Sequence, residues 1–596
     1  MAENKISVQN RDIDVRDLPK IAEQLMDEYA RRKDNRSDLE SRWDEVDRQL
    51  RVEADTSHKN LANNKPDPDK KWLPEVELPL QSETLEMLVA DCRRELFPRG
   101  REWFAARAAL TDKYLNAFMK AETPITNEKG GYDGSLNQDN ADQIAKSAIS
   151  HYHRQYDLRA HVDLINSEAL SYGFGVGRVV PVEKRILGHT MSGLLKKAEI
   201  PILIPRSARN VYLDDSAHAV MNEGVVIGPN IIEYSCKRLA DLRAAALTDD
   251  SYIPQQMSLL ETNENGEVEL VELEGDLVYE KADETIVVRD VRITAAKGTG
   301  KKTTFGIIRQ RPSSGCTYIV FDYQIENTRQ RAGTAPLLKG APVNRIAAML
   351  MNGMLESGAL KNAPPIGYSR DDPYFASTGG PKIHPNALWE NTEGVEVFDK
   401  VGGDPSVFLS AFQAMVAMYY DVTGVNPPRL GAQTKSHTTA YAKDAELSQG
   451  AVRTVDYVDQ VLEGPLPRFL EMEYRFAKKN WTKQVVYCEA WKDFIELERA
   501  HLPDIVQFEA FGAGAPAEEM AAQQQMLNAI QTALQVDMIA IQLGKEPKMD
   551  HGKIIEMILR KGGVHDLSEV VTEDTGEPAP MQGNGQLPGV LSATPQ

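Results

Sequence analysis

The feature that most constrains the fold is a block of strand-like runs set between two regions of helical pattern. Between about Gly173 and Tyr323, apolar and polar residues alternate in runs such as AEIPILIP, EVELVELEGDLVYE and ETIVVRDVRIT. Gly, Asn or Pro separates these runs, and period-two alternation predicts β-strands. Before and after the block, apolar residues recur at helical spacing. We therefore expect an α+β, helix-rich protein with an antiparallel or mixed sheet region.

The chain is long and acidic. It has 596 residues, 42% of them hydrophobic, and a formal net charge of -20. It is too long for one ordinary domain and too apolar for wholesale disorder. A protein that binds nucleic acid by coating phosphates needs a basic face, so the acidic balance argues against that mode and favours local contacts with any polyanion.

Nothing in the sequence indicates secretion by a standard signal or a membrane span. The first residues are polar and acidic, and no stretch of about 18 apolar residues occurs. The four cysteines, Cys92, Cys236, Cys316 and Cys488, lie far apart without a Cys-x-x-Cys pair. We expect reduced thiols in a reducing compartment.

Helical patterns precede the strand block. Residues 18–54 carry apolar positions at helical spacing, with a break near residues 35–37. A second helix, which Ser82 or Thr84 could cap, must end before Pro98. A further helical run covers residues 141–170.

Two long helical patterns follow the strand block and frame a turn-rich insert. Residues 336–362 and 404–424 place apolar side chains at helical steps, whereas residues 363–403 are rich in turn formers. We expect the two helices to pack against each other. The side chains expected at their contact are Ile346, Leu350, Met354, Phe408, Phe412 and Met415.

The chain returns to helical patterns after a loop at residues 425–441. Residues 442–515 hold a long helical run, broken near Gly464 and Pro465, and a short strand, QVVYCEAW. Residues 516–563 are again helical in pattern. The last residues, 564–596, have little apolar content, so we expect a disordered tail.

The run AAKGTGKKTTFG is similar to a phosphate-binding P-loop but fails its pattern. A Walker A motif needs Gly at position 295 and Ser or Thr at position 302, where this chain has Ala295 and Lys302. Strand-like runs on both sides favour a hairpin turn instead. Similarly, Gly173, Gly175 and Gly177 follow a helix and precede a strand, the reverse of a dinucleotide-binding turn, so we interpret them as close-packing positions.

One cluster could supply metal ligands. Asp214, Asp215 and His218 offer oxygen and nitrogen atoms, but adjacent carboxylates after a strand are more often turn and helix-cap groups. The H-E-x-x-H, G-x-S-x-G and kinase motifs are absent from the sequence. We therefore expect no metal, no cofactor and no enzymatic activity.

The order of these segments resembles the portal (head-to-tail connector) proteins of tailed double-stranded DNA bacteriophages, especially those of short-tailed phages (podoviruses). The resemblance rests on APLLKGAPVNRIAAMLMNGMLESGALKNAPP, on TGVNPPRLGAQTKSHTTAYAKDAELSQG and on two earlier stretches, SYGFGVGRVVPV and PRSARNVYLDDSAHA. It spans roughly residues 72–563, and its motifs are loose patterns rather than catalytic signatures.

The resemblance implies a ring of about twelve copies around a channel through which DNA is packaged and ejected. It assigns the N-terminal region and wing to residues 1–335, the stem helices to 336–362 and 404–424, and the clip to 363–403. The tunnel loop would be 425–441, a helical return to the wing 442–515, and the crown 516–563. The acidic subunits would give a repulsive, low-friction wall.

Particular residues and partners follow from the resemblance. Arg429, Lys435 and His437 would make transient phosphate contacts, or else be solvated or paired with acids of a neighbouring copy. Tyr374, Phe375 and Trp389 in the clip would pack on a neighbouring copy or an adaptor, or within a local cluster. The implied partners are the major capsid and scaffolding proteins, the terminase large subunit, a tail adaptor or head-completion protein, and ejection (core) proteins. The implied location is the portal vertex of the virion, and host cytoplasm during assembly.

Two rival hypotheses remain open. The first is a metal-dependent phosphodiester-cleaving phage enzyme that uses Asp214, Asp215 and His218. The second is a non-portal scaffold protein that binds partners through its N-terminal and C-terminal helices and forms a monomer or small oligomer.

Overall fold

The chain divides into two compact units, Met1–Ala515 and Pro516–Gln596. The structure, a computed structural model, describes only residues of the first unit. The described residues are 5–9, 17–55, 70–98, 103–121, 138–187, 195–213, 230–281, 284–297, 305–312, 316–323, 335–364, 366–369, 388–391, 396–397, 404–425, 453–481, 483–488, 491 and 493–512.

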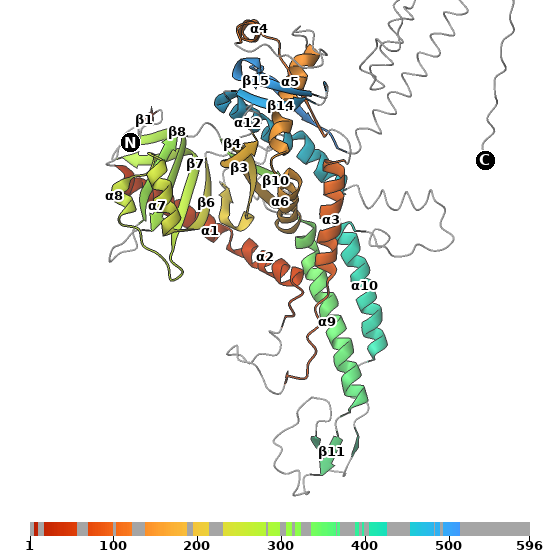
Figure 1. The fold of residues 1–596 in the computed structure, drawn as a ribbon. Coiled ribbons are helices and arrows are strands. Elements are labelled where there is room, and N and C mark those ends of the chain that lie inside the picture. Colours follow the sequence, from red (N-terminus) through yellow and green to blue (C-terminus); the bar gives the residue numbers. More distant parts are fainter. Residues whose placement is uncertain are drawn as a thin grey trace, which may run out of the picture. The chain divides into compact units, whose positions relative to one another are not determined.

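The predicted strand block forms two sheets (Figure 1). One has the order β1-β8-β7-β6-β5, with β9 also paired to β8, and the other has the order β10-β3-β4. The strands of the first are β1 (Lys5–Gln9), β5 (Val211–Leu213), β6 (Asn230–Arg238), β7 (Glu267–Lys281), β8 (Glu284–Lys297) and β9 (Phe305–Pro312). Those of the second are β3 (Phe174–Leu187), β4 (Leu195–Arg206) and β10 (Tyr318–Asp322). Every pair is antiparallel except β1 with β8, so a helix-rich α+β fold is confirmed.

Helices cover both faces of the first sheet. On one face, α1 (Leu18–Asn35) inserts Ile21 and Leu25 into a cluster with apolar side chains of β7 and β8. On the other, α7 (Leu239–Thr248) and α8 (Pro254–Met257) contribute Leu242 and Met257 to a smaller cluster. The predicted break near residue 36 is confirmed, because α2 (Ser37–Leu50) starts two residues after α1 ends.

A larger core surrounds the second sheet. It joins side chains of α2, α3 (Leu80–Leu96), α5 (Gln138–His153), α6 (Leu158–Tyr172) and α12 (Pro465–Asn480). The break at Gly464 is confirmed, since helical residues 453–463 precede α12. The run predicted over residues 141–170 is instead two helices, because Asp157 caps α6 by accepting a hydrogen bond from the Ala160 backbone N–H.

Other short elements complete the described part of the chain. These are α4 (Asp112–Met119), β2 (Phe104–Ala108) paired with β16 (Val506–Ala510), and β14 (Lys483–Cys488) paired with β15 (Asp493–Glu498). The sequence predicted only β14 among these strands. A three-stranded sheet of β11 (Ile366–Ser369), β12 (Leu388–Asn391) and β13 (Glu396–Val397) lies between the two long helices in the chain.

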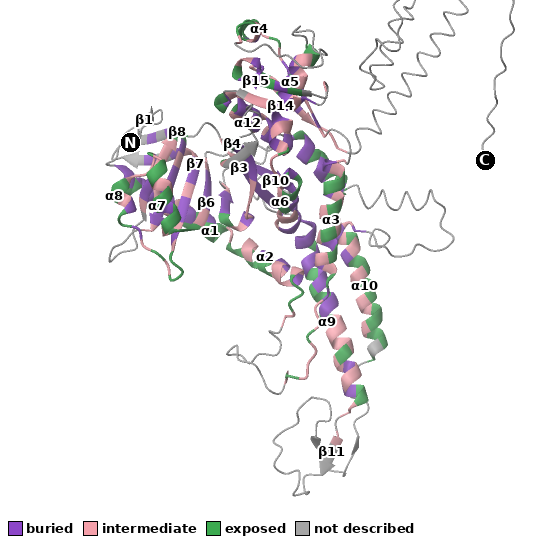
Figure 2. Ribbon diagram, viewed as in Figure 1, coloured by how far each residue is buried: buried purple, intermediate pink, exposed green. Residues whose placement is uncertain are grey.

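The two long helices are α9 (Pro336–Asn362) and α10 (Pro405–Thr423), at the residues where the sequence predicted them. Their roles as stem helices, and the assignment of the other regions, stay predictions. In Figure 2, α10 and the later turns of α9 show mainly intermediate and exposed residues, unlike the elements of the core.

Candidate functional site

Local sequence explains where α9 and α10 begin and end. Each has a proline in its first turn, where the missing N–H costs nothing. Asp404 caps α10, with its side chain accepting a hydrogen bond from the Ser406 backbone N–H at 3.1 Å. Gly424 ends α10 in the left-handed region at φ 76°.

The two helices pack antiparallel, with small residues on α9 receiving large residues of α10. A Cβ atom added at Gly340 would lie 2.7 Å from the Tyr419 ring, and one at Gly353 would lie 3.0 Å from the Phe408 ring. Between these points Ala347 and Ala348 are buried, and Phe412 and Met415 pack on the same cluster. This fit fixes the register of the hairpin.

The hairpin is also tied to the preceding helix. The Tyr419 hydroxyl bonds to the Leu80 carbonyl and to the Thr84 hydroxyl, both at 3.0 Å. The prediction that Ser82 or Thr84 caps α3 is wrong, because the cap position is Pro79 and Thr84 is buried in this contact. Further along α9, the Asn352 side chain accepts a hydrogen bond from the Val76 backbone N–H and donates one to the Val76 carbonyl oxygen.

The outward faces of the hairpin carry large apolar side chains. Their exposed fractions are 64% for Met349, 63% for Val407, 48% for Met418, 47% for Ile346, 43% for Leu409 and 41% for Leu355. A single exposed apolar residue is ordinary, but six on one helical pair form a surface typical of protein association.

The six residues expected at the helix contact therefore fall into two groups, those at or near the contact and one that faces outward. Phe408, Phe412 and Met415 lie at the contact described above, and Leu350 and Met354 are partly buried. Ile346, in contrast, is on the outward face of the single subunit. Ala347 and Ala348 take the inner positions because α10 approaches too closely for larger residues.

Most of the other predicted site residues lie outside the described residues. This holds for Arg429, Lys435, His437, Tyr374 and Phe375. Trp389 lies in β12, where its backbone is opposite Gly367 of β11. The alternative metal ligands, Asp214, Asp215 and His218, are also outside the described residues. Within the described ranges there is no cluster of three or more potential metal ligands.

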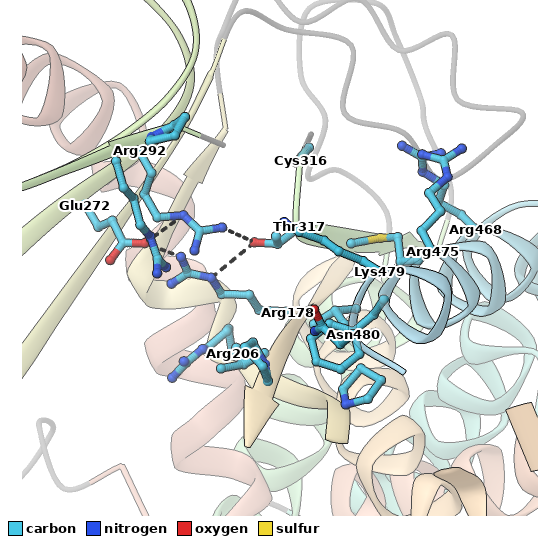
Figure 3. A pocket seen from close by; sticks show the side chains of 18 of the residues that line it. Arg178, Arg206, Glu272, Arg292, Cys316, Thr317, Arg468, Arg475, Lys479 and Asn480 are labelled. Atoms are coloured by element: carbon cyan, nitrogen blue, oxygen red, sulfur yellow. Dashed lines mark hydrogen bonds and ion pairs between the residues drawn. The ribbon is translucent and has the colours of Figure 1, made fainter. Parts of the chain in front are cut away.

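A basic cavity in this acidic chain was not predicted from the sequence. The cavity has a volume of about 680 Å³ and lies among β3, β4, β6 to β9 and α12. Among the described residues that line it, nine are Arg or Lys, and Glu272 is the one carboxylate. Figure 3 shows Arg178 and Arg292 from the strands on one side and Arg468 and Arg475 from α12 on the other.

A buried ion cluster forms the strand side of this cavity. Arg178 of β3 donates to Glu233 of β6 at 2.8 Å and also to Glu272 of β7. Arg292 of β8 lies 2.6 Å from Glu274 of β7. Burial alone would raise the pKa of Glu272, but the charges of Arg178 and Arg292 outweigh it and lower this pKa to about 2. The cluster therefore joins the two sheets through charged groups that remain ionised.

Three further observations concern the whole described part of the chain. None of the four cysteines forms a disulfide, and Cys92 and Cys488 are buried. Burial raises the pKa of the Cys316 thiol to about 11, which keeps it protonated at neutral pH. Among the described helices, none combines the length and apolar character needed to span a bilayer.

Comparison with known proteins identifies no family. The chain matches no model of a known protein family and no curated protein. Among solved structures, it is similar to a chain of "Virion of native gene transfer agent (GTA) particle", with 10% sequence identity and a TM-score of 0.28. The alignment covers 73% of this chain and 99% of that chain. At this TM-score the likeness carries no argument about fold or function.

Proposed function

We propose that this protein is a phage portal protein, a subunit of a ring of about twelve copies at one capsid vertex. The ring is the channel for packaging and ejection of double-stranded DNA, and the subunit has a structural rather than an enzymatic role. The observation that carries the proposal is the α9–α10 hairpin, which is rigidly packed inside and apolar outside.

The outward apolar side chains need a partner in the assembled protein. Burying apolar surface contributes about 25 cal/mol per Å², so leaving six large side chains in water forgoes several kcal/mol per subunit. A neighbouring copy of the same hairpin supplies such a partner. Residues on both helices are exposed, namely Met349 on α9 and Val407 on α10, so both helices offer apolar surface to neighbouring copies. A closed heterologous ring forms when two different surfaces of each subunit meet those of its neighbours.

The acidic charge supports a channel through which DNA passes rather than a site that binds nucleic acid tightly. A net charge of -20 per subunit repels phosphates on average, which lets DNA move through a ring without tight binding. Within this proposal Arg429, Lys435 and His437 make the transient phosphate contacts, and Tyr374, Phe375 and Trp389 contact an adaptor or neighbouring copy. The partners are capsid, scaffolding, terminase, tail-adaptor and ejection proteins, and the location is the virion.

The test is the mass and symmetry of the purified full-length protein, measured by light scattering and negative-stain imaging. We expect rings of about twelve copies with an open centre. Changing Met349→Glu together with Val407→Glu should abolish the rings without unfolding the subunit, because both side chains are already exposed and the new charges would be buried between copies.

A matched control is Met119→Glu together with Leu247→Glu. These side chains are 82% and 88% exposed on α4 and α7, so the same chemistry is introduced away from the hairpin. This control should still form rings. A wild-type protein that stays monomeric at all concentrations tested, or a hairpin variant that assembles as well as the control, would contradict the proposal.

A further inference from the structure

Among the described residues, the basic cavity gathers more cations than carboxylates. Its nine lining cations are matched by five carboxylates, counting Glu272 in the lining and the ion-pair partners Glu233, Glu274, Asp249 and Glu471 behind it. About four positive charges are left over. In a chain with a net charge of -20, such a local excess is not a consequence of composition.

Three of the cations form no direct ion pair with a carboxylate among the described residues. They are Lys237 on β6, Arg311 on β9 and Lys479 on α12, which approach the cavity from three different elements. In addition, the buried Nε atoms of Arg206 and Arg292 have no hydrogen-bond partner, although each lies near a carboxylate. Unsatisfied donors of this kind are costly unless something accepts from them.

The cations that line the cavity repel one another. Burial, together with repulsion from Arg292 and Arg309, lowers the pKa of Arg311 to about 10. A bound anion would relieve this repulsion and raise the pKa of Arg311 again. Because the cations lie close together, a bound anion is attracted by several of them at once, and this attraction favours binding.

We propose that this cavity binds a phosphate-bearing anion with several negative charges. The polar lining consists almost entirely of hydrogen-bond donors, with Glu272, Thr317 and Asn480 as the few acceptors. Phosphate groups offer acceptors alone, and guanidinium groups bind them through paired N–H donors. An acidic peptide fits less well, because its backbone N–H groups would need acceptors that the lining lacks.

Two sources of such a ligand share this chemistry, namely a nucleic-acid backbone and a free polyphosphate or nucleotide. The volume of about 680 Å³ accommodates several phosphate groups. Apolar side chains such as Val179, Pro201 and Phe476 add a surface on which a base can pack. The proposal does not depend on ring formation, since every group named belongs to one chain.

The experiment uses the full-length protein with two probes at low ionic strength. Binding of inorganic tripolyphosphate is measured by calorimetry, and binding of a fluorescent single-stranded oligonucleotide by anisotropy. The variant Arg311→Gln/Lys479→Gln should weaken binding of the preferred probe at least tenfold. It should fold normally, because neither residue forms a direct ion pair with a described carboxylate that the change would leave unpaired.

The matched control is Arg51→Gln/Lys120→Gln, which removes the same two charges from exposed positions outside the cavity. It should bind as the wild type does. Tighter binding of the oligonucleotide assigns the nucleic-acid backbone, and tighter binding of tripolyphosphate assigns a free phosphate compound. The proposal is overturned if neither probe binds, if the control loses affinity as much as the cavity variant, or if a polyglutamate peptide displaces the probe at lower concentration than unlabelled phosphate ligand.

Discussion

Gly175 shows how a single position fixes the contact between a helix and a sheet. A Cβ atom there would lie 2.1 Å from the carbonyl oxygen of Ile165 in α6, a distance that no side chain can tolerate. The interpretation as close-packing positions is confirmed for Gly175 and Gly177, whereas Gly173 ends α6 in the left-handed region at φ 98°. Because β3 pairs with both β4 and β10, a shift at Gly175 would be transmitted to the second sheet and its core.

We predict that Gly175→Ala lowers the free energy of unfolding by about 2–3 kcal/mol or more, since the overlap is with backbone atoms that cannot move aside. Gly358→Ala is the control, because an added Cβ on that helical residue meets nothing within 4 Å. It should raise stability by about 0.5–1 kcal/mol. Urea unfolding of both variants is the measurement. Equal effects would show that the α6–β3 contact is looser than described.

At the scale of elements, the buried ion cluster is the charged connection between the two sheets. Arg178 of β3 reaches Glu233 and Glu272, which belong to β6 and β7 of the other sheet. The pKa of Glu272 in the folded protein, about 2, is below its ordinary value of 4.5. The stability that this group contributes is therefore fully present above about pH 4.5 and is lost as the pH falls towards 2.

We predict that acid unfolding depends on Glu272. The wild type should lose stability between about pH 4.5 and pH 2, and Glu272→Gln should be less stable at pH 7 and lose less over the same interval. Glu264→Gln, at an exposed carboxylate, serves as the comparison. Urea midpoints at pH 7, 4 and 3 provide the measurement. An unchanged pH profile in Glu272→Gln would refute the assigned role of the cluster.

For the whole molecule, acidic charge and apolar surface act in opposite directions. The net charge of -20 disfavours association between copies, whereas the outward side chains of α9 and α10 favour it. Raising the salt concentration screens the repulsion but leaves apolar burial in place. Assembly should therefore be promoted by moderate salt, in contrast to phosphate binding in the basic cavity, which salt weakens.

We predict that deleting the residues after Asp566 leaves assembly intact. That segment has little apolar content, so it can bury little surface against a neighbouring copy. Light scattering and imaging of the truncated and full-length proteins, side by side, test this. Loss of rings in the truncated protein alone would show that the tail is part of the assembly interface.

Features that depend on neighbouring residues in the chain were predictable from the sequence alone. The break between α1 and α2, the proline starts of α9 and α10, the break at Gly464 and the alternation of β7 and β8 follow from backbone and side-chain preferences within a few residues. Features that depend on contacts between distant segments are set by the packing of the folded chain. β2 pairs with β16 across most of the chain, and Ile346 faces outward because Ala347 and Ala348 admit α10.

The basic cavity belongs to the second kind. No local motif marks Lys237, Arg311 or Lys479. The packing of the sheet strands against α12 brings them together. The buried Glu473, 2.7 Å from His153 Nε2 and hydrogen-bonded to Tyr156, is hidden in the same way, because its partners are more than 300 residues distant in the chain. Local preferences act over a few residues, whereas charge excess and burial are sums over groups that only the folded chain brings together.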